Sequence, residues 1–254
     1  PGGVYLDVPG SLLGQVMDEV EGKKSLRQVI DLNAASIPAP AAVARALEVL
    51  KSAKKPLLII GKGAAYAQCD EKVRQLVETL GFPYLPMSMA KGLMPDNHVQ
   101  CASAARSLVL KESDCVFLIG ARLNWLLGQG QGPAWGEKYT KKFVQIDIEP
   151  TEIDSNQTIS APLIGDIESC ADALLDAIGG NWEKPPKGWT GAVRAKVEAN
   201  VARMAPKLRN NNSPMDYQGA MGVIKDVMAE HQDTILVNEG ANALDQCRSI
   251  VDIH

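Results

Sequence analysis

Short apolar runs that alternate with stretches of helical periodicity constrain this fold more than any other feature of the sequence. The runs are residues 56–60, 83–85, 115–119, 143–146 and 161–164. Runs this apolar are typical of parallel strands that are buried on both faces of a sheet. Helical spacing of apolar residues marks 41–53, 73–80, 104–111 and 167–178. The alternation predicts an α/β fold, a doubly wound parallel sheet, which we place at residues 41–180.

The composition changes on both sides of this predicted domain. Residues 9–40 mix charged and polar side chains without a steady period and end in two closely spaced prolines, which is typical of a linker. Residues 181–212 begin with a proline pair and are expected to be a second linker that contains a helix at 190–208. Residues 213–254 are expected to begin a second α/β domain, with a helix followed by a strand at 234–237.

Both ends of the chain are expected to be cuts within a longer protein. The sequence begins at Pro1 and enters a short apolar run at once, so that residues 1–8 read as a strand already in progress. Residues 249–254 stop within an apolar pattern, whereas natural termini usually carry polar, poorly ordered residues. The alternative is a short protein whose first residues were removed by processing.

Charge and composition argue against several classes of partner. A net charge of -4 without a basic stripe makes nucleic acid an unsuitable partner. No apolar run approaches the ~20 residues that a membrane-spanning helix needs. Five scattered cysteines without a CxxC pattern favour reduced thiols in an intracellular protein, and with three histidines a zinc site is not expected.

Polar residues follow several of the predicted strands. They are Lys62 within Gly61-Lys62-Gly63, then Arg122, Asp147 and Asp166. Ligands of open α/β sheets bind at the carboxyl ends of the strands, where glycines let backbone N–H groups approach a phosphate. Taken together, the four positions suggest a nucleotide pocket. The glycines and the acids have simpler interpretations as well: a tight turn for the glycines, and a helix N-cap or a solvated carboxylate for the acids.

A second candidate site begins at the segment Ser103-Ala104-Ala105-Arg106-Ser107. A helix start that carries an arginine and hydroxyl groups is suited to phosphate, although an ordinary helix end with a surface arginine fits equally well. The stretch 123–127 is interpreted as packing. No Ser/His/Asp order, metal-ligand spacing or carboxylate pair supplies a complete catalytic set.

Four longer motifs make the sequence similar to a known family. They are Gly61-Lys62-Gly63-Ala64-Ala65-Tyr66-Ala67, Met87-Ser88-Met89-Ala90-Lys91-Gly92, Gly120-Ala121-Arg122-Leu123-Asn124-Trp125-Leu126-Leu127 and Val237-Asn238-Glu239-Gly240-Ala241-Asn242. The chain resembles, over its whole length, the thiamine-diphosphate-dependent enzymes that act on acyl-CoA, the oxalyl-CoA decarboxylases and the 2-hydroxyacyl-CoA lyases. Residues 87–92 and 152–157 favour the decarboxylases.

This resemblance implies three α/β domains and a distribution of site residues among them. Residues 1–8 would end the pyrimidine-binding domain, 41–180 would form the central domain, and 213–254 would begin the pyrophosphate-binding domain. An activating ADP would contact Lys62, Arg122, Asp147, Asp166 and Ile167. Coenzyme A would contact Ser103, Ala104, Ala105, Arg106, Ser107, Asn200, Arg248 and Ser249. Thiamine diphosphate would contact Tyr217, Ala241, Asn242 and Ala243.

The same resemblance implies the reaction and what this chain lacks for it. The activity would be decarboxylation of oxalyl-CoA to formyl-CoA and CO₂ by a homodimer or homotetramer, in the cytoplasm or, in a eukaryote, the peroxisome. The catalytic glutamate would precede Pro1 and the magnesium motif would follow His254, so these 254 residues alone would be inactive. The alternatives are a 2-hydroxyacyl-CoA lyase, another thiamine-diphosphate enzyme such as an acetolactate synthase, and a non-catalytic nucleotide-binding module.

Overall fold

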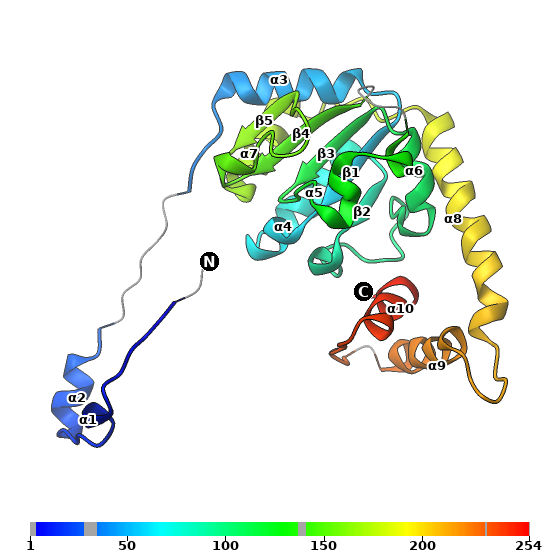
Figure 1. The fold of residues 1–254 in the computed structure, drawn as a ribbon. Helices are drawn as coiled ribbons and strands as arrows, with labels where there is room; N and C mark the ends of the chain where they lie inside the picture. The colour runs from blue at the N-terminus through cyan, green and yellow to red at the C-terminus, as the bar shows by residue number, and fades with distance from the viewer. Residues whose placement is uncertain (1–3, 28–34, 137–140, 232, 254) are drawn as a thin grey trace. The chain divides into compact units, whose positions relative to one another are not determined.

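The computed structural model describes residues 4–27, 35–136, 141–231 and 233–253 (Figure 1). The chain divides into two compact units, Pro1–Ala34 and Ala35–His254. None of the helices in these described ranges is long and apolar enough to cross a membrane.

The first unit contains two short helices, α1 (Gly10–Leu13) and α2 (Glu19–Ser25). Asp18 begins α2 because its carboxylate accepts hydrogen bonds from the backbone N–H groups of Val20 and Glu21. The linker predicted from residue 9 therefore contains local helical structure. Residues 4–8, the described part of the predicted first strand, form no strand, so that prediction is wrong for this unit. A β-strand needs a neighbour to complete its hydrogen bonds, and Val4 is 93% exposed.

A five-stranded parallel sheet forms the centre of the second unit (Figure 1). Its strands are β1 (Pro56–Ile60), β2 (Tyr84–Pro86), β3 (Cys115–Ile119), β4 (Lys142–Asp147) and β5 (Ala161–Ile164), in the order β2-β1-β3-β4-β5. Every side chain of β1 and β3 is buried, as the apolar runs predicted. The predicted parallel sheet is confirmed, and β1 and β3 are covered on both faces.

Helices and short 3-10 turns connect the strands. The helices of this unit are α3 (Pro40–Ser52), α4 (Lys62–Tyr66), α5 (Asp70–Leu80), α6 (Arg106–Glu112), α7 (Ile167–Ile178), α8 (Lys187–Leu208), α9 (Tyr217–Glu230) and α10 (Asn242–Ile250). The 3-10 turns are η1 (Ser88–Ala90), η2 (Ser103–Ala105), η3 (Trp125–Gly130), η4 (Pro133–Trp135) and η5 (Pro150–Glu152). Proline at the first position of α3 and left-handed glycines after α5 and α7 set these helix ends.

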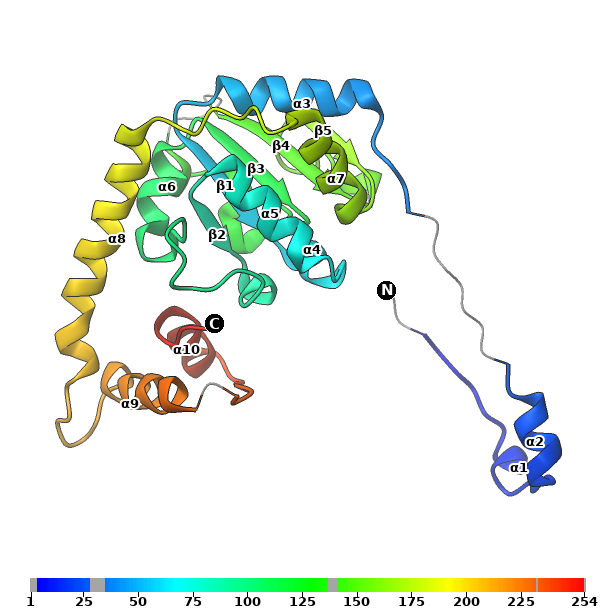
Figure 2. The ribbon, with the colours of Figure 1, turned by 180° about the vertical axis from the view of Figure 1, so that it is seen from behind.

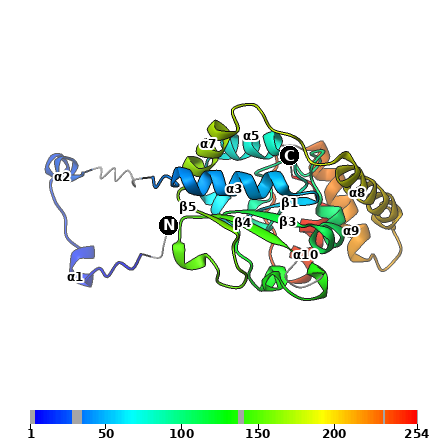
Figure 3. The same ribbon diagram turned by 90° about the horizontal axis from the view of Figure 1, so that it is seen from above.

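Two apolar clusters cover the two faces of the sheet. Helices α3, α5 and α7 pack on one face of the sheet (Figures 2 and 3). Leu50, Leu76 and Leu174 of these helices meet inward side chains of the strands. Helix α6 and the first half of α8 pack on the other face. Trp189 anchors α8 there, because its buried indole Nε1 donates to the Pro56 carbonyl at 2.9 Å. The doubly wound architecture is thereby confirmed.

The end of the chain packs as a small cluster of its own. Met221 of α9 meets Cys247, Ile250 and Val251 of the α10 segment. Residues 234–237, predicted as a strand, have no regular structure, and Ile235 and Val237 are each 87% exposed. The apolar pattern there is real, but no described strand lies alongside to pair with it. Helix α10 was not predicted.

Candidate functional site

The strand order creates a switch point between β1 and β3. The chain leaves β1 in one direction to form β2 and returns on the other side to form β3. Ligands of open α/β sheets bind beyond the carboxyl ends of the strands at such a point. Lys62, Arg122, Asp147 and Asp166 follow or end β1, β3, β4 and β5, which are neighbours in the sheet. With strands ~4.8 Å apart, the four positions span about 14 Å along one edge.

Glycines tie the β1 and β3 loops together at this edge. The N–H of Gly61 donates to the Ile119 carbonyl and the N–H of Gly63 donates to the Gly120 carbonyl, each at 2.9 Å. A Cβ added to Gly61 would lie 2.3 Å from the Gly120 oxygen, so only glycine permits this contact. The N–H groups of Gly61 and Gly63 are therefore already bonded within the protein. They hold two loops together, and residues from Lys62 onward form α4 in place of a bare turn.

Each charged side chain at the edge has a protein partner. Lys62 Nζ lies 4.9 Å from the centre of the Tyr66 ring. Arg122 Nη1 lies 2.7 Å from Glu152 Oε1. Asp166 accepts from the Ser169 N–H at 3.1 Å, so its interpretation as the N-cap of α7 is confirmed. Ile167 is buried in the core and can offer a ligand only its backbone.

Asp147 is the least satisfied of these groups. Burial raises the pKa of its carboxyl group, while the Glu149 N–H at 3.1 Å and the nearby Gln145 amide act in the opposite direction. Gln145, two residues earlier on the same face of β4, is 2% exposed, and although its Nε2 is near this carboxylate it reaches no acceptor with hydrogen-bond geometry among the described residues. An orphaned donor beside a half-buried carboxylate fits a ligand that is rich in hydroxyl groups and acceptors, as a nucleotide is.

The second candidate site is a cavity of about 270 Å³ beyond the carboxyl end of β2. Ser103 and Arg106 line it from η2 and α6, and Arg248 and Ser249 line it from α10. These residues come from distant parts of the sequence, and the structure brings them to one cavity. Asn200 is close by, because its Nδ2 donates to the Ala104 carbonyl at 2.6 Å. Ala105 is buried, so its side chain faces the core.

The charges around this cavity favour an anion. Lys91, Arg106 and Arg248 line it together with two carboxylates. Each carboxylate already has a cation, because Asp96 pairs with Lys91 and Asp245 pairs with Arg248. Arg106 has no carboxylate partner among the described ion pairs, and its Nη2 donates to the Leu126 carbonyl at 3.2 Å. Burial lowers the pKa of Arg106, but a guanidinium stays charged at neutral pH.

The prediction that residues 123–127 pack in the core is correct for only part of this stretch. Leu123 and Leu127 are buried, but Trp125 is 76% exposed, and Leu126 lines the cavity. The sequence interpretation missed Lys91, Asp96 and Asp245 as cavity residues as well. Lys91 lies in the motif at 87–92, but nothing in that motif shows which distant segment its side chain meets.

The residues assigned to thiamine diphosphate by resemblance lie at helix starts. Tyr217 is the first residue of α9 and is 53% exposed. Residues 241–243 begin α10, whose first turn has no side-chain cap. Its free backbone N–H groups suit the oxygens of a diphosphate, so the segment fits that part of the cofactor. No group of three or more His, Cys, Asp or Glu side chains that could hold a metal occurs in the described ranges.

Comparison with known proteins identifies the family. The model of the thiamine pyrophosphate enzyme central domain matches residues 43–174, just over half of the chain. The chain belongs to this family. The matched range of the thiamine pyrophosphate enzyme domain covers all five strands of the sheet and lies within the range 41–180 expected for a central domain.

The curated relatives of this chain are named for two different activities. It is 42% identical over 254 residues to the oxalyl-CoA decarboxylase of Escherichia coli (strain K12), covering 100% of this chain and 44% of the relative. It is 36% identical over 253 residues to 2-hydroxyacyl-CoA lyase 1 of Mus musculus and 35% identical to that of Homo sapiens, covering 42% and 43% of them. The chain thus spans less than half the length of these relatives. The resemblance inferred from the four motifs is confirmed.

Proposed function

We propose that the full-length protein is a thiamine-diphosphate-dependent carboxy-lyase that converts oxalyl-CoA into formyl-CoA and CO₂. The observation that carries the proposal is the cavity at which Ser103, Arg106, Arg248 and Ser249 meet with an excess of positive charge. Coenzyme A carries phosphates, for which arginines and hydroxyl groups are suitable donors. The identity of 42% to an oxalyl-CoA decarboxylase over the whole chain supports the same acyl group.

In this proposal the described residues bind and orient the substrate and cofactor. Arg106 and Arg248 hold the phosphates of coenzyme A, the serines donate hydrogen bonds, and Asn200 fixes the Ala104 backbone beside them. The start of α10 and Tyr217 contact thiamine diphosphate, which when bound supplies the carbanion chemistry of the reaction. The catalytic glutamate and the magnesium ligands are assigned to residues outside this chain. The working protein is a homodimer or homotetramer of the cytoplasm.

We further propose ADP as the ligand of the sheet edge that carries Lys62, Arg122, Asp147, Asp166 and Ile167. Asp147 accepts ribose hydroxyl groups, and Gln145 donates to a nucleotide oxygen, which satisfies its orphaned amide. Lys62 and Arg122 contact the phosphates after exchanging their partners Tyr66 and Glu152. The glycines of the β1 and β3 loops set the shape of the edge without donating to the ligand.

Replacement of Asp147 by asparagine is expected to weaken ADP binding while leaving the folded protein at least as stable at pH 7. The raised pKa means that the charged carboxylate is disfavoured in the folded state. This penalty is present above the folded pKa and disappears as the pH falls through it, so the stability gain of Asp147→Asn is expected at pH 7 and not at low pH. Calorimetric titration with ADP measures the affinity. Urea unfolding at pH 7 and at low pH measures the change in the free energy of unfolding. A variant that binds ADP as well as the wild type would exclude Asp147 from the site.

Product analysis tests the main proposal. The full-length protein is incubated with oxalyl-CoA, thiamine diphosphate and magnesium, and CO₂ and formyl-CoA are measured. Release of both supports the decarboxylase. Cleavage of a longer 2-hydroxyacyl-CoA without action on oxalyl-CoA would move the protein to the second candidate, the lyase activity named for relatives that are 36% and 35% identical. Inertness toward both substrates would favour the non-catalytic nucleotide-binding module.

A further inference from the structure

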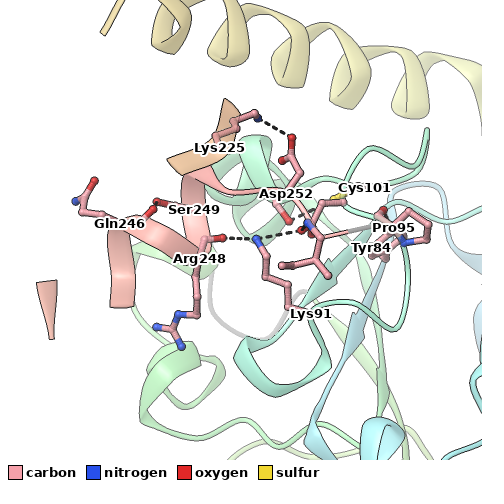
Figure 4. A network of polar contacts seen from close by, with 12 residues as sticks. Tyr84, Lys91, Pro95, Cys101, Lys225, Gln246, Arg248, Ser249 and Asp252 are labelled. Atoms are coloured by element: carbon pink, nitrogen blue, oxygen red, sulfur yellow. Dashed lines mark hydrogen bonds and ion pairs between the residues drawn. The ribbon is translucent and has the colours of Figure 1, made fainter. Parts of the chain in front are cut away.

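Lys91 connects the sheet domain to the far end of α10. It follows η1, and its side chain is only 17% exposed. Its Nζ donates to the Arg248 carbonyl at 2.5 Å (Figure 4). The same Nζ lies 3.0 Å from Asp96 Oδ2. The lysine thus binds the backbone of the same residue whose guanidinium lines the cavity.

Asp96 binds the segment that follows α10. Its side chain is 8% exposed, and its Oδ2 accepts from the Ile253 N–H at 2.8 Å. The Asp96 N–H donates in turn to the Ile253 carbonyl at 3.0 Å. Lys91 and Asp96, which we call the clip, therefore hold the chain on both sides of the α10 carboxyl end.

The buried apolar residues of α10 do not attach it to the sheet. Its buried residues Cys247 and Ile250 cluster with Met221 and Val251, apart from the two clusters on the faces of the sheet. The polar contacts of Lys91 and Asp96 therefore fasten α10 to the wall of the cavity that carries Ser103 and Arg106, next to the place where the Ile253 side chain lies against Gly92. Removal of one partner from a buried pair is costly, because it leaves the other charge buried and uncompensated.

We propose that Lys91 and Asp96 are positioning residues that set the distance between Arg248 on α10 and Arg106 on α6, and hence the affinity for the phosphates of coenzyme A. The inference rests on the proposed function for the identity of the ligand. The clip itself is defined by the contacts of Lys91 and Asp96 alone. Asp96 acts through its hold on residues 248–253, and its own negative charge opposes an anion in the cavity.

The charge of Asp96 and its hold on residues 248–253 have opposite effects on anion binding, which allows a clear test in the full-length protein. Asp96→Asn removes a negative charge beside the cavity, so an electrostatic effect alone would tighten the binding of free coenzyme A. The clip predicts the reverse: affinity falls about tenfold, a coupling of the usual size. Amide hydrogen exchange at residues 242–253, measured without ligand, is expected to accelerate. Unchanged or tighter binding together with unchanged exchange would overturn the proposal.

Two further variants serve as controls for this test. Lys225→Met removes a neighbouring ion pair to Asp252 whose side chains are 37% and 39% exposed, and it is expected to change affinity by less than about twofold because exposed pairs are weak. The double variant Lys91→Met/Asp96→Asn leaves no unpaired buried charge and replaces the single variant if that fails to fold. It is expected to show the same loss of affinity and the same faster exchange, and wild-type values for both would overturn the clip.

The exchange measurement separates this inference from the proposed function. If the wild type binds no coenzyme A, the proposed ligand is wrong, yet faster exchange at 242–253 in Asp96→Asn still supports the clip. If the wild type binds coenzyme A and exchange in the variant is unchanged, the clip is wrong while the proposed function stands.

Discussion

Replacing Gly120 by alanine is expected to lower the free energy of unfolding by about 3 kcal/mol, as the sum of backbone strain and a steric collision. Gly120 has φ +55°, a left-handed conformation, and a Cβ there would lie 2.4 Å from the Ala64 backbone nitrogen. Both atoms of this collision belong to the joined β1 and β3 loops, so neither can move without breaking the hydrogen bond between Gly63 and Gly120. Urea unfolding followed by circular dichroism measures the loss.

Gly180→Ala is the matched control for this effect. Gly180 has φ +77°, but nothing lies within 4 Å of the position that its Cβ would take. Its replacement therefore imposes backbone strain without collision and is expected to cost about 1 kcal/mol. Equal losses in the two variants would show that the contact between the loops adds nothing.

Replacing Arg106 by methionine is expected to weaken the binding of coenzyme A by about 10- to 100-fold, the range for loss of hydrogen bonds to a charged group. Arg106 is the cavity cation without a carboxylate partner among the described ion pairs, so its charge is the one most available to a phosphate. Methionine retains an apolar stem of similar length, which limits the loss of packing. Isothermal titration calorimetry of the full-length protein with coenzyme A measures the effect.

Arg194→Met controls for the removal of a positive charge. Arg194 lies on α8, is half exposed, and pairs with Glu198 one helical turn away. Its replacement is expected to leave the affinity for coenzyme A unchanged. The affinity of the wild type should also fall as salt rises, because ions screen attraction between the phosphates and the arginines. An Arg106→Met variant that binds like the wild type would place the phosphates elsewhere.

The sheet could be predicted from the sequence because its information is local. Each apolar run is short, and those of β1 and β3 are buried along their whole length, so pattern alone identified all five strands. The start of α7 was also correct, since Asp166 caps it. The strand at 234–237 could not be judged in the same way. Its apolar pattern is equally good, but a strand depends on a partner, and pattern says nothing about partners.

The candidate sites also differ in how far local sequence pattern could predict them. Residues that follow adjacent strands could be grouped before the structure was known, because parallel strands end at a common edge. The meeting of Arg106 with Arg248 depends on where α8 and α9 carry the chain, and only the resemblance suggested it. The side chains that hold α10 were missed altogether, because the Lys91 and Asp96 contacts join segments with no periodic relation to each other.

Helix α8 has a consequence for how the sequence can change in length. Its first half is fixed to the sheet by Trp189 and Val193, whereas residues 201–207 are all exposed and free to vary in side chain. Insertion of one residue in that exposed half would nevertheless rotate everything after it by about 100° and shift it by about 1.5 Å. Arg248 would then turn away from Arg106. The exposed half of α8 is thus tolerant of substitution and intolerant of insertion or deletion. The number of residues in this half determines the rotation of the segment after it, and so determines whether the two walls of the cavity face each other.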